Sequence, residues 1–151
     1  MTNSPQSFGL GPALADGDWE GWSTWTGSEP FEEHVGPFYA KRDDKGQMIA
    51  GCRVLPHNLN GAGSIHGGSL MAFADYSLFM IAYDETRDIP AVTVTLQGEF
   101  LASTKLGARL VNRGEVLKSG GSLVFVRGTT EADGRPIFSF SGVLKLVRPR
   151  G

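Results

Sequence analysis

The stretch NGAGSIHGGSLMAFAD, residues 60–75, decides the fold that we predict for this chain. It opens as a glycine-rich loop with a lone histidine, His66, and then becomes an apolar run that extends to residue 84. The length and composition of residues 68–84 predict a helix, and because its residues are apolar nearly all round, we expect it to be buried on several sides. Asp75 is the only acidic residue of the stretch, in a setting where a charge is costly to bury.

Strand-forming segments lie on both sides of this helix. Residues 38–56 predict two short strands around a turn, and four longer antiparallel strands are expected after the helix. Those four segments are residues 90–100, 107–120, 121–134 and 135–148. This order predicts an α+β fold, in which an antiparallel sheet wraps around one long central helix.

Two of the long strands carry finer predictions. In the first, valines and a leucine alternate with polar residues, so one face of the strand should be polar. The apolar set is Val92, Val94 and Leu96, and the polar set is Thr93, Thr95 and Gln97. In the last strand, Gly142 marks a candidate bulge.

The first 29 residues are predicted to form an N-terminal arm, followed by a single domain over residues 30–151. The arm is rich in Gly, Ser and Pro and lacks a clear period, but Trp19, Trp22 and Trp25 are spaced three residues apart. That spacing fits a short amphipathic helix, or more simply an arm whose aromatic rings cap an apolar surface.

Composition excludes several classes of function. The chain has 151 residues, of which 40% are hydrophobic and 20% charged, and its formal net charge is −2, so it is an ordinary globular protein without the basic blocks that bind nucleic acid. The single cysteine, Cys52, excludes a disulfide framework, and the histidines lack a metal-ligand spacing. Without a secretory signal or an apolar run of membrane-spanning length, we expect a cytoplasmic location and no membrane partner.

The residues of the opening stretch suit chemistry at a carbonyl group. A glycine pair at a helix start, Gly67 and Gly68, leaves backbone N–H groups open to an anion or a polarised carbonyl oxygen. Asp75 is the only nearby acid that could serve as base or nucleophile. It follows Gly67 by eight residues, roughly 12 Å along a helix, so one carbonyl cannot touch both. A shared reaction therefore needs two copies of the chain and a site at a dimer interface.

Each of these residues also has a structural explanation. Asp75 could be a buried, hydrogen-bonded group or lie on a narrow polar stripe, and His66 could be a loop or capping residue. The glycines could form a simple helix entry, Asn60 suits a turn, and Thr93 is common in strands.

The pattern Asn60–Gly68, followed by an apolar helix with Phe-Ala-Asp at 73–75, resembles the hotdog-fold acyl-CoA thioesterases of the phenylacetate-pathway (PaaI-like) type. The resemblance covers residues 30–147 and implies a long helix enclosed by an antiparallel sheet. The N-terminal arm with its three tryptophans is extra, and could cover the acyl pocket or extend the dimer.

The resemblance implies roles for individual residues. Gly67, with Gly68, would donate backbone N–H groups to the thioester carbonyl, and Asp75 would act as nucleophile or general base beside the glycine end of a second subunit. Asn60 and His66 would position the thioester or the attacking water, and Thr93 would orient that water. Surface cations that could bind the phosphates of coenzyme A are Lys105, Lys118 and Arg127.

The predicted activity is hydrolysis of an acyl-CoA to the free acid and coenzyme A, without metal or redox cofactor. Aromatic or medium-chain acyl groups are expected as substrates. The protein is expected to form a homodimer with a shared active site, and two such dimers are expected to pair into a homotetramer. Two alternatives stay open: a hotdog hydratase or dehydratase, for which a second histidine after Asp75 is missing, and a non-catalytic acyl-CoA binding protein, which would not need a buried acid.

Overall fold

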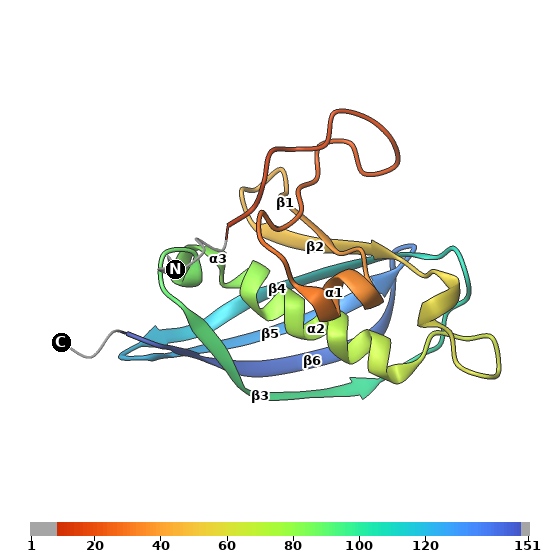
Figure 1. Ribbon diagram of the computed structural model, residues 1–151. Helices are drawn as coiled ribbons and strands as arrows, with labels where there is room; N and C mark the ends of the chain where they lie inside the picture. The colour runs from red at the N-terminus through yellow and green to blue at the C-terminus, as the bar shows by residue number, and fades with distance from the viewer. Residues whose placement is uncertain (1–8, 149–151) are drawn as a thin grey trace.

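A computed structural model describes residues 9–148, so residues 1–8 of the predicted arm and 149–151 of the predicted domain lie outside the described part. The order of two short strands, one long helix and four long strands agrees with the sequence prediction (Figure 1). The helices are α1 (Pro30–Val35), α2 (Gly67–Ile81) and α3 (Tyr83–Thr86), with a 3-10 turn at Pro56–Asn58. The strands are β1 (Tyr39–Arg42), β2 (Met48–Arg53), β3 (Ala91–Phe100), β4 (Arg109–Gly120), β5 (Leu123–Ala132) and β6 (Arg135–Leu146).

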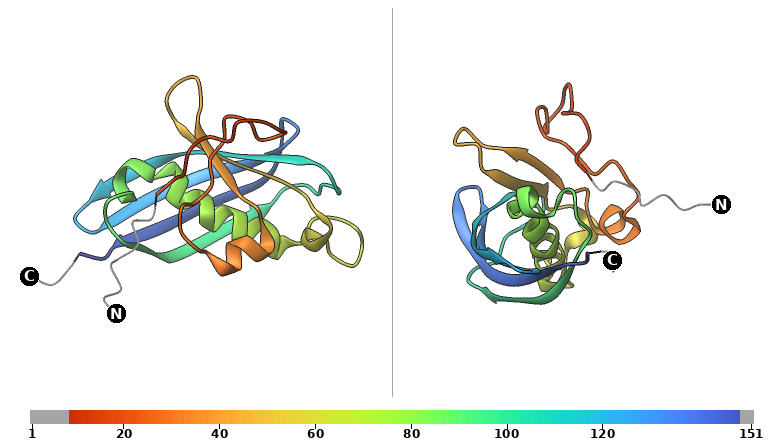
Figure 2. Two further views of the ribbon diagram at one scale, coloured as in Figure 1. Left: turned by 45° about the horizontal axis from the view of Figure 1, so that its top comes forward. Right: turned by 90° about the vertical axis from the view of Figure 1, so that its left-hand side faces the viewer.

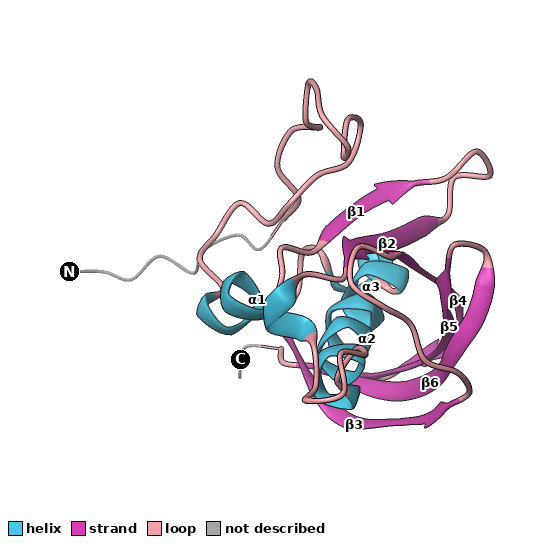
Figure 3. Ribbon diagram, turned by 90° about the vertical axis from the view of Figure 1, so that its right-hand side faces the viewer, coloured by secondary structure: helices cyan, strands magenta, loops and turns pink. Residues whose placement is uncertain are grey.

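The six strands form one antiparallel sheet in the order β1-β2-β4-β5-β6-β3. Seen along the helix, the sheet curls around α2, which lies in its concave face (Figure 3). The predicted α+β architecture is therefore confirmed. Strand β3 is an edge strand that pairs only with β6 within the described chain, and it lies at the opposite end of the sheet from β1.

Helix α2 is buried on several sides, as its composition predicts. Its fully enclosed residues include Phe73, Tyr76 and Leu78, which pack against the sheet and against Phe38. Gly142 of β6 allows the helix to come this close, because a Cβ there would overlap the side chain of Leu78. Within residues 9–148, no helix is long and apolar enough to cross a membrane.

The predicted bulge at Gly142 is wrong, and the irregularity lies in the neighbouring strand. Between β3 and β6 the register shifts from Thr93 to Thr95, which leaves Val94 as the extra residue of β3. The extra residue resets the alternation of side chains along the strand. As a result, Val92 and Val94 are 51% and 54% exposed, and the polar Thr93 faces the helix instead.

The N-terminal arm packs on the outer surface of the sheet. Trp19 and Trp22 are buried over Ile49, and Trp19 stacks on Tyr39 with ring centroids 4.5 Å apart. The guanidinium of Arg109 lies 3.9 Å above the centre of the Trp19 ring. The prediction that these aromatic rings cap an apolar surface is confirmed for this part of the arm.

The alternative of a short amphipathic helix in the arm is wrong. Gly17 and Gly21 have φ angles of 84° and 83°, which lie in the left-handed region and form turns around Trp19. Seen from the side, the arm forms a loop beside β1 and β2 and then passes down to α1 (Figure 2).

Candidate functional site

The start of helix α2 has one backbone donor that is occupied and one that is free. His66 is the N-cap residue, and its Nδ1 atom accepts a hydrogen bond of 2.8 Å from the N–H of Gly68. A neutral imidazole that accepts at Nδ1 carries its proton on Nε2. The N–H of Gly67 makes no hydrogen bond to any residue in the described range. Gly67, rather than Gly68, thus has the N–H group that is left without an acceptor in the described chain.

The loop before the helix is held by two asparagines with different tasks. The Oδ1 atom of Asn60 accepts hydrogen bonds from the N–H groups of Ala62 (2.9 Å) and Ser64 (3.1 Å), which fixes the turn. This leaves the Nδ2 group of Asn60 to donate elsewhere. Asn58 is buried, and its carbonyl accepts from the N–H of His66 at 2.8 Å.

Asn58 is a positioning residue that the sequence interpretation missed. Its Nδ2 group donates to the carbonyl of Val35 at the end of α1, at 2.7 Å, and its Oδ1 accepts from the N–H of Leu55 at 2.9 Å. The glycine-rich loop is therefore tied to α1 as well as to α2. Asn60, two residues later, belongs to the pattern that carries the family resemblance, whereas no motif in the sequence marks Asn58.

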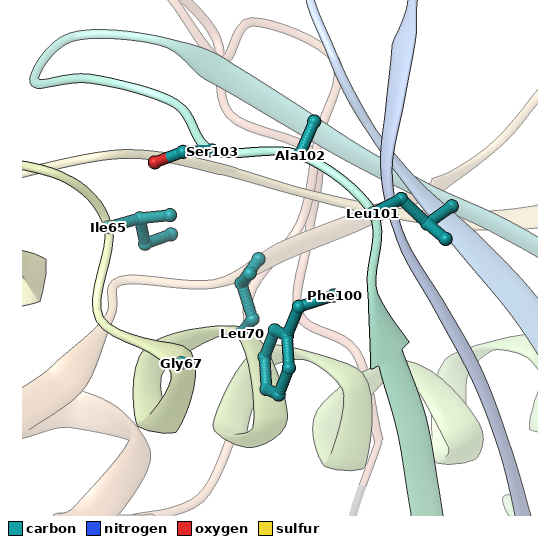
Figure 4. A pocket seen from close by; sticks show the side chains of 7 residues that line it. All are labelled: Ile65, Gly67, Leu70, Phe100, Leu101, Ala102 and Ser103. Atoms are coloured by element: carbon teal, nitrogen blue, oxygen red, sulfur yellow. The ribbon is translucent and has the colours of Figure 1, made fainter.

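An apolar cavity of about 330 Å³ opens beside Gly67 (Figure 4). The close-up shows the Phe100 ring against the first turns of α2, and a Cβ at position 67 would lie 3.1 Å from the tip of that ring. A side chain larger than hydrogen at this position would therefore crowd both the ring and the free N–H. The cavity is lined by Ile65, Gly67, Leu70, Phe100, Leu101, Ala102 and Ser103.

Asp75 and Thr93 are brought together, although 18 residues separate them in the sequence. The hydroxyl of Thr93 donates a hydrogen bond of 2.6 Å to Oδ1 of Asp75, and both side chains are half-buried. A hydroxyl that donates to a carboxylate oxygen fixes the orientation of that carboxylate. The bulge at Val94 and the apolar surroundings of α2 together place this pair between the helix and the edge strand.

Asp75 does not line the cavity beside Gly67 in the described chain. The two residues lie on the same helix, roughly 12 Å apart along its axis. The geometry of one chain thus gives two half-sites, a free N–H donor beside an apolar cavity and an oriented carboxylate at the edge strand. It leaves the predicted sharing between two subunits open.

A second, more polar hollow of about 520 Å³ adjoins the apolar cavity, and the two share Ser103. Its walls carry Lys105 and Arg135, whose Nη2 atom donates to the carbonyl of Ser103 at 3.1 Å. Lys118 and Arg127 do not line it, and Arg127 is paired with Glu115. Of the three cations predicted to bind coenzyme A, only Lys105 lines this polar hollow, and Arg135, which the sequence did not suggest, lines it as well.

Comparison with known sequences gives consistent matches. The family model described as Thioesterase superfamily matches residues 62–137. A Pseudomonas aeruginosa protein named as an esterase is 30% identical over 128 residues, which is 84% of this chain and 96% of that protein. Human acyl-coenzyme A thioesterase 13 is 29% identical over 114 residues, which is 74% of this chain and 81% of that protein.

Solved structures share the fold at lower identity. The Escherichia coli PaaI protein from the phenylacetic acid degradation operon has a TM-score of 0.68 at 20% identity, with 80% of this chain and 86% of that chain covered. A hypothetical thioesterase protein from Streptococcus pneumoniae, crystallised with coenzyme A, has a TM-score of 0.65 at 21% identity, with 76% and 91% covered. The predicted hotdog fold is confirmed.

The Thr93–Asp75 hydrogen bond can be tested with a matched pair of variants. Replacing Thr93 with Val removes the donor but keeps the β-branched shape, so kcat/KM for thioester hydrolysis should fall about 10- to 100-fold, the usual effect of losing a hydrogen bond to a charged group. The Thr95→Val variant, on the same strand but exposed, should retain full activity. Equal activities of the two variants would contradict a role for this hydrogen bond.

Proposed function

We propose, since the chain belongs to the thioesterase superfamily and is a thioester hydrolase, that its substrate is an acyl-coenzyme A, which it cleaves to the free acid and coenzyme A. The observation that carries this proposal is the carboxylate of Asp75, held by Thr93 on an otherwise apolar helix that begins with the free N–H of Gly67. The name of the human relative and the coenzyme A in the S. pneumoniae structure support the substrate class.

In the proposed mechanism the thioester carbonyl oxygen accepts a hydrogen bond from the N–H of Gly67. That donor lies at the positive end of the α2 dipole, so it stabilises the negative charge that develops on the oxygen when the carbonyl carbon is attacked. Asp75 of a second subunit supplies the attack, either directly as nucleophile or as the base that takes a proton from water. The free Nε2–H of His66 and Nδ2 group of Asn60 are suited to orient the thioester or the water.

The proposed dimer forms through the free edge of β3. Edge strands expose unpaired backbone groups and are usually protected, yet β3 presents Val92, Val94 and Phe100 to solvent in the isolated chain. A second copy paired there would cover these side chains and bring its Asp75, which lies next to β3, towards the first copy. The further pairing into a homotetramer stays a prediction.

The two hollows suit the two ends of an acyl-CoA. The apolar cavity would take the acyl group or the apolar part of the pantetheine arm, and the polar hollow with Lys105 and Arg135 would bind phosphate oxygens. A cavity of about 330 Å³ is of the size that suits an aromatic or medium-chain acyl group. A cytoplasmic location and a reaction without metal or redox cofactor stay predictions from the sequence.

The first test measures thiol release from a panel of acyl-CoAs by the wild type and the Asp75→Asn variant. Because the amide can neither take a proton nor attack as a carboxylate does, we expect hydrolysis to fall by about 10²- to 10⁴-fold with the fold retained by circular dichroism. A folded Asp75→Asn variant with wild-type turnover would contradict the mechanism. Tight binding of acyl-CoA by a wild type that hydrolyses none of the panel would favour the non-catalytic alternative.

Mixed dimers test whether the site is shared. Asp75→Ala removes the carboxylate, and Gly67→Val places a side chain against Phe100 and the free N–H. Each variant alone should be inactive, but a dimer with one copy of each retains one complete site. Mixing them under proven subunit exchange should restore activity, up to roughly a quarter of the wild-type value if subunits pair at random. No restoration would argue against a shared site.

The phosphate-binding hollow can be tested by substrate comparison. Lys105→Ala and Arg135→Ala should each raise KM for acyl-CoA by roughly 3- to 10-fold, because each removes one exposed cation that faces the phosphates. The same variants should leave KM unchanged for a short thioester of N-acetylcysteamine, which lacks phosphate. Lys118→Ala is the control that changes the charge equally, and an equal KM increase in this variant would contradict the assignment.

A further inference from the structure

The two half-sites lie at opposite ends of the edge strand β3. Near its start, the hydroxyl of Thr93 donates the hydrogen bond of 2.6 Å to Asp75. At its end, the ring of Phe100 reaches α2, where a Cβ at position 67 would lie 3.1 Å from the ring (Figure 4). Both side chains are therefore on the face of β3 that meets the helix. Thr93 marks the position of the carboxylate along the strand, and Phe100 marks the position of the free N–H.

Pairing β3 with a second copy of itself can join these half-sites. A strand that pairs with its own copy about a two-fold axis runs antiparallel to it. Side chains directly opposite each other then share one face of the sheet, with Cβ atoms about 4.5–5.5 Å apart. If Thr93 of the second copy lies opposite Phe100 of the first, the carboxylate of Asp75 arrives beside the N–H of Gly67. By symmetry, the other two half-sites meet at the far end of the paired strands.

Other registers keep the half-sites apart. A shift of one residue turns the paired side chains to opposite faces, so Thr93 would no longer share a face with Phe100. A shift of two residues restores the face but moves the hydroxyl about 6.6 Å along the strand. A carboxylate displaced that far does not reach a carbonyl held by the N–H of Gly67. Only one register of the paired strands therefore completes the site.

The bulge determines where the two-fold axis passes in this register. Val94 is the extra residue of β3, and both Val94 and Thr95 are exposed, so together they take up one outward-facing step of the strand. Counted inward from the Thr93–Phe100 pair, positions 94 and 95 lie opposite 99, position 96 lies opposite 98, and position 97 lies opposite itself.

We infer that two copies of the chain pair through β3 about a two-fold axis at Gln97, which places Asp75 of each copy beside Gly67 of the other. This inference rests on the proposed function, because a shared site is what requires the half-sites to meet. It fixes the interface to one register, and the partner that fits it is a second copy of this chain.

The charges along β3 agree with this axis. Gln97 is exposed and neutral, so its two copies can lie side by side without repulsion. The two copies of Glu99 are then four residues apart along the strands, about 13 Å. An axis at Glu99 would instead place two like charges directly opposite each other, which destabilises a strand pair.

The exposed apolar residues agree with it independently. Val92 and Val94 are exposed at one end of β3, and Leu101 is exposed directly after the other end. The side chain of Leu101 points away from the ring of Phe100 (Figure 4). In the inferred register, position 92 of one copy lies opposite position 101 of the other. The apolar side chains at each end of the strand are thus covered by those at the opposite end of the second copy.

A cysteine scan of the outward-facing positions reads the axis directly. Thr95→Cys, Gln97→Cys and Glu99→Cys each add one exposed thiol, while the native Cys52 is buried and the wild type gives the background. A disulfide needs Cα atoms within about 7 Å, and positions 95 and 99 are each about 13 Å from their own copies. Under mild oxidation, Gln97→Cys should therefore form a covalent dimer at least about tenfold faster than either other variant.

Two further readings test the same register. In mixed dimers of Thr95→Cys and Glu99→Cys the two thiols lie opposite each other, so a covalent heterodimer should form although neither variant cross-links alone. The oxidised Gln97→Cys dimer should hydrolyse acyl-CoA at the rate of its reduced form, because the trapped register is the one that completes the site.

A different cross-linking pattern would overturn the register. Thr95→Cys or Glu99→Cys alone reacting as fast as Gln97→Cys is one such result, and the absence of any cross-link from thiols that react with Ellman's reagent is another. An oxidised Gln97→Cys dimer that regains activity only on reduction would overturn it as well. A wild type that hydrolyses no thioester would instead overturn the proposed function, and the cross-linking pattern would still decide the register.

Discussion

The constraint on which the structure depends is that α2 is apolar nearly all round and must be enclosed. A flat sheet could cover only one side of it, so the sheet curls and the helix lies in its concave face. Close approach requires strand positions without side chains. Gly142 faces Leu78 of the helix, and Gly114 faces Ile81, and at both positions a Cβ would also collide with backbone of a neighbouring strand. The fit of the helix to the sheet is thus set by these glycines as much as by the large apolar residues.

The enclosure of α2 by the sheet also limits where polar and reactive groups can lie in this fold. A buried helix can present polar groups at two places: its first turn, where N–H groups lack acceptors, and the face that meets the edge of the sheet. Gly67 lies in the first turn, and Asp75 lies on the face that meets the edge strand. There the hydroxyl of Thr93 donates a hydrogen bond to the Asp75 carboxylate, which offsets part of the cost of burying it. Because the two places are fixed by the length of one helix, the fold separates donor and carboxylate before any substrate binds.

Much of the fold could be predicted from the sequence, because it is expressed in composition and period. The apolar run of α2, the strand segments and the turn before β2 are local signals, and each strand was expected within a few residues of its place. Spacing alone placed His66 and Gly67 at the start of α2 and Asp75 further along the same helix. The bulge at Val94, the engaged N–H of Gly68 and the contact between Trp25 and Glu32 were not predictable, since they depend on pairing register and on segments brought together only by folding.

Two features place a hydroxyl beside Asp75: a threonine at position 93 and the extra residue, Val94, in β3. Without that extra residue, Thr93 and Leu96 would face opposite sides of the sheet. Insertions and deletions in this strand are therefore more damaging than substitutions at its exposed positions. Among related sequences, the length of this segment should vary less than its composition, and an alignment that opens a gap here would misplace the hydroxyl by one full face of the sheet.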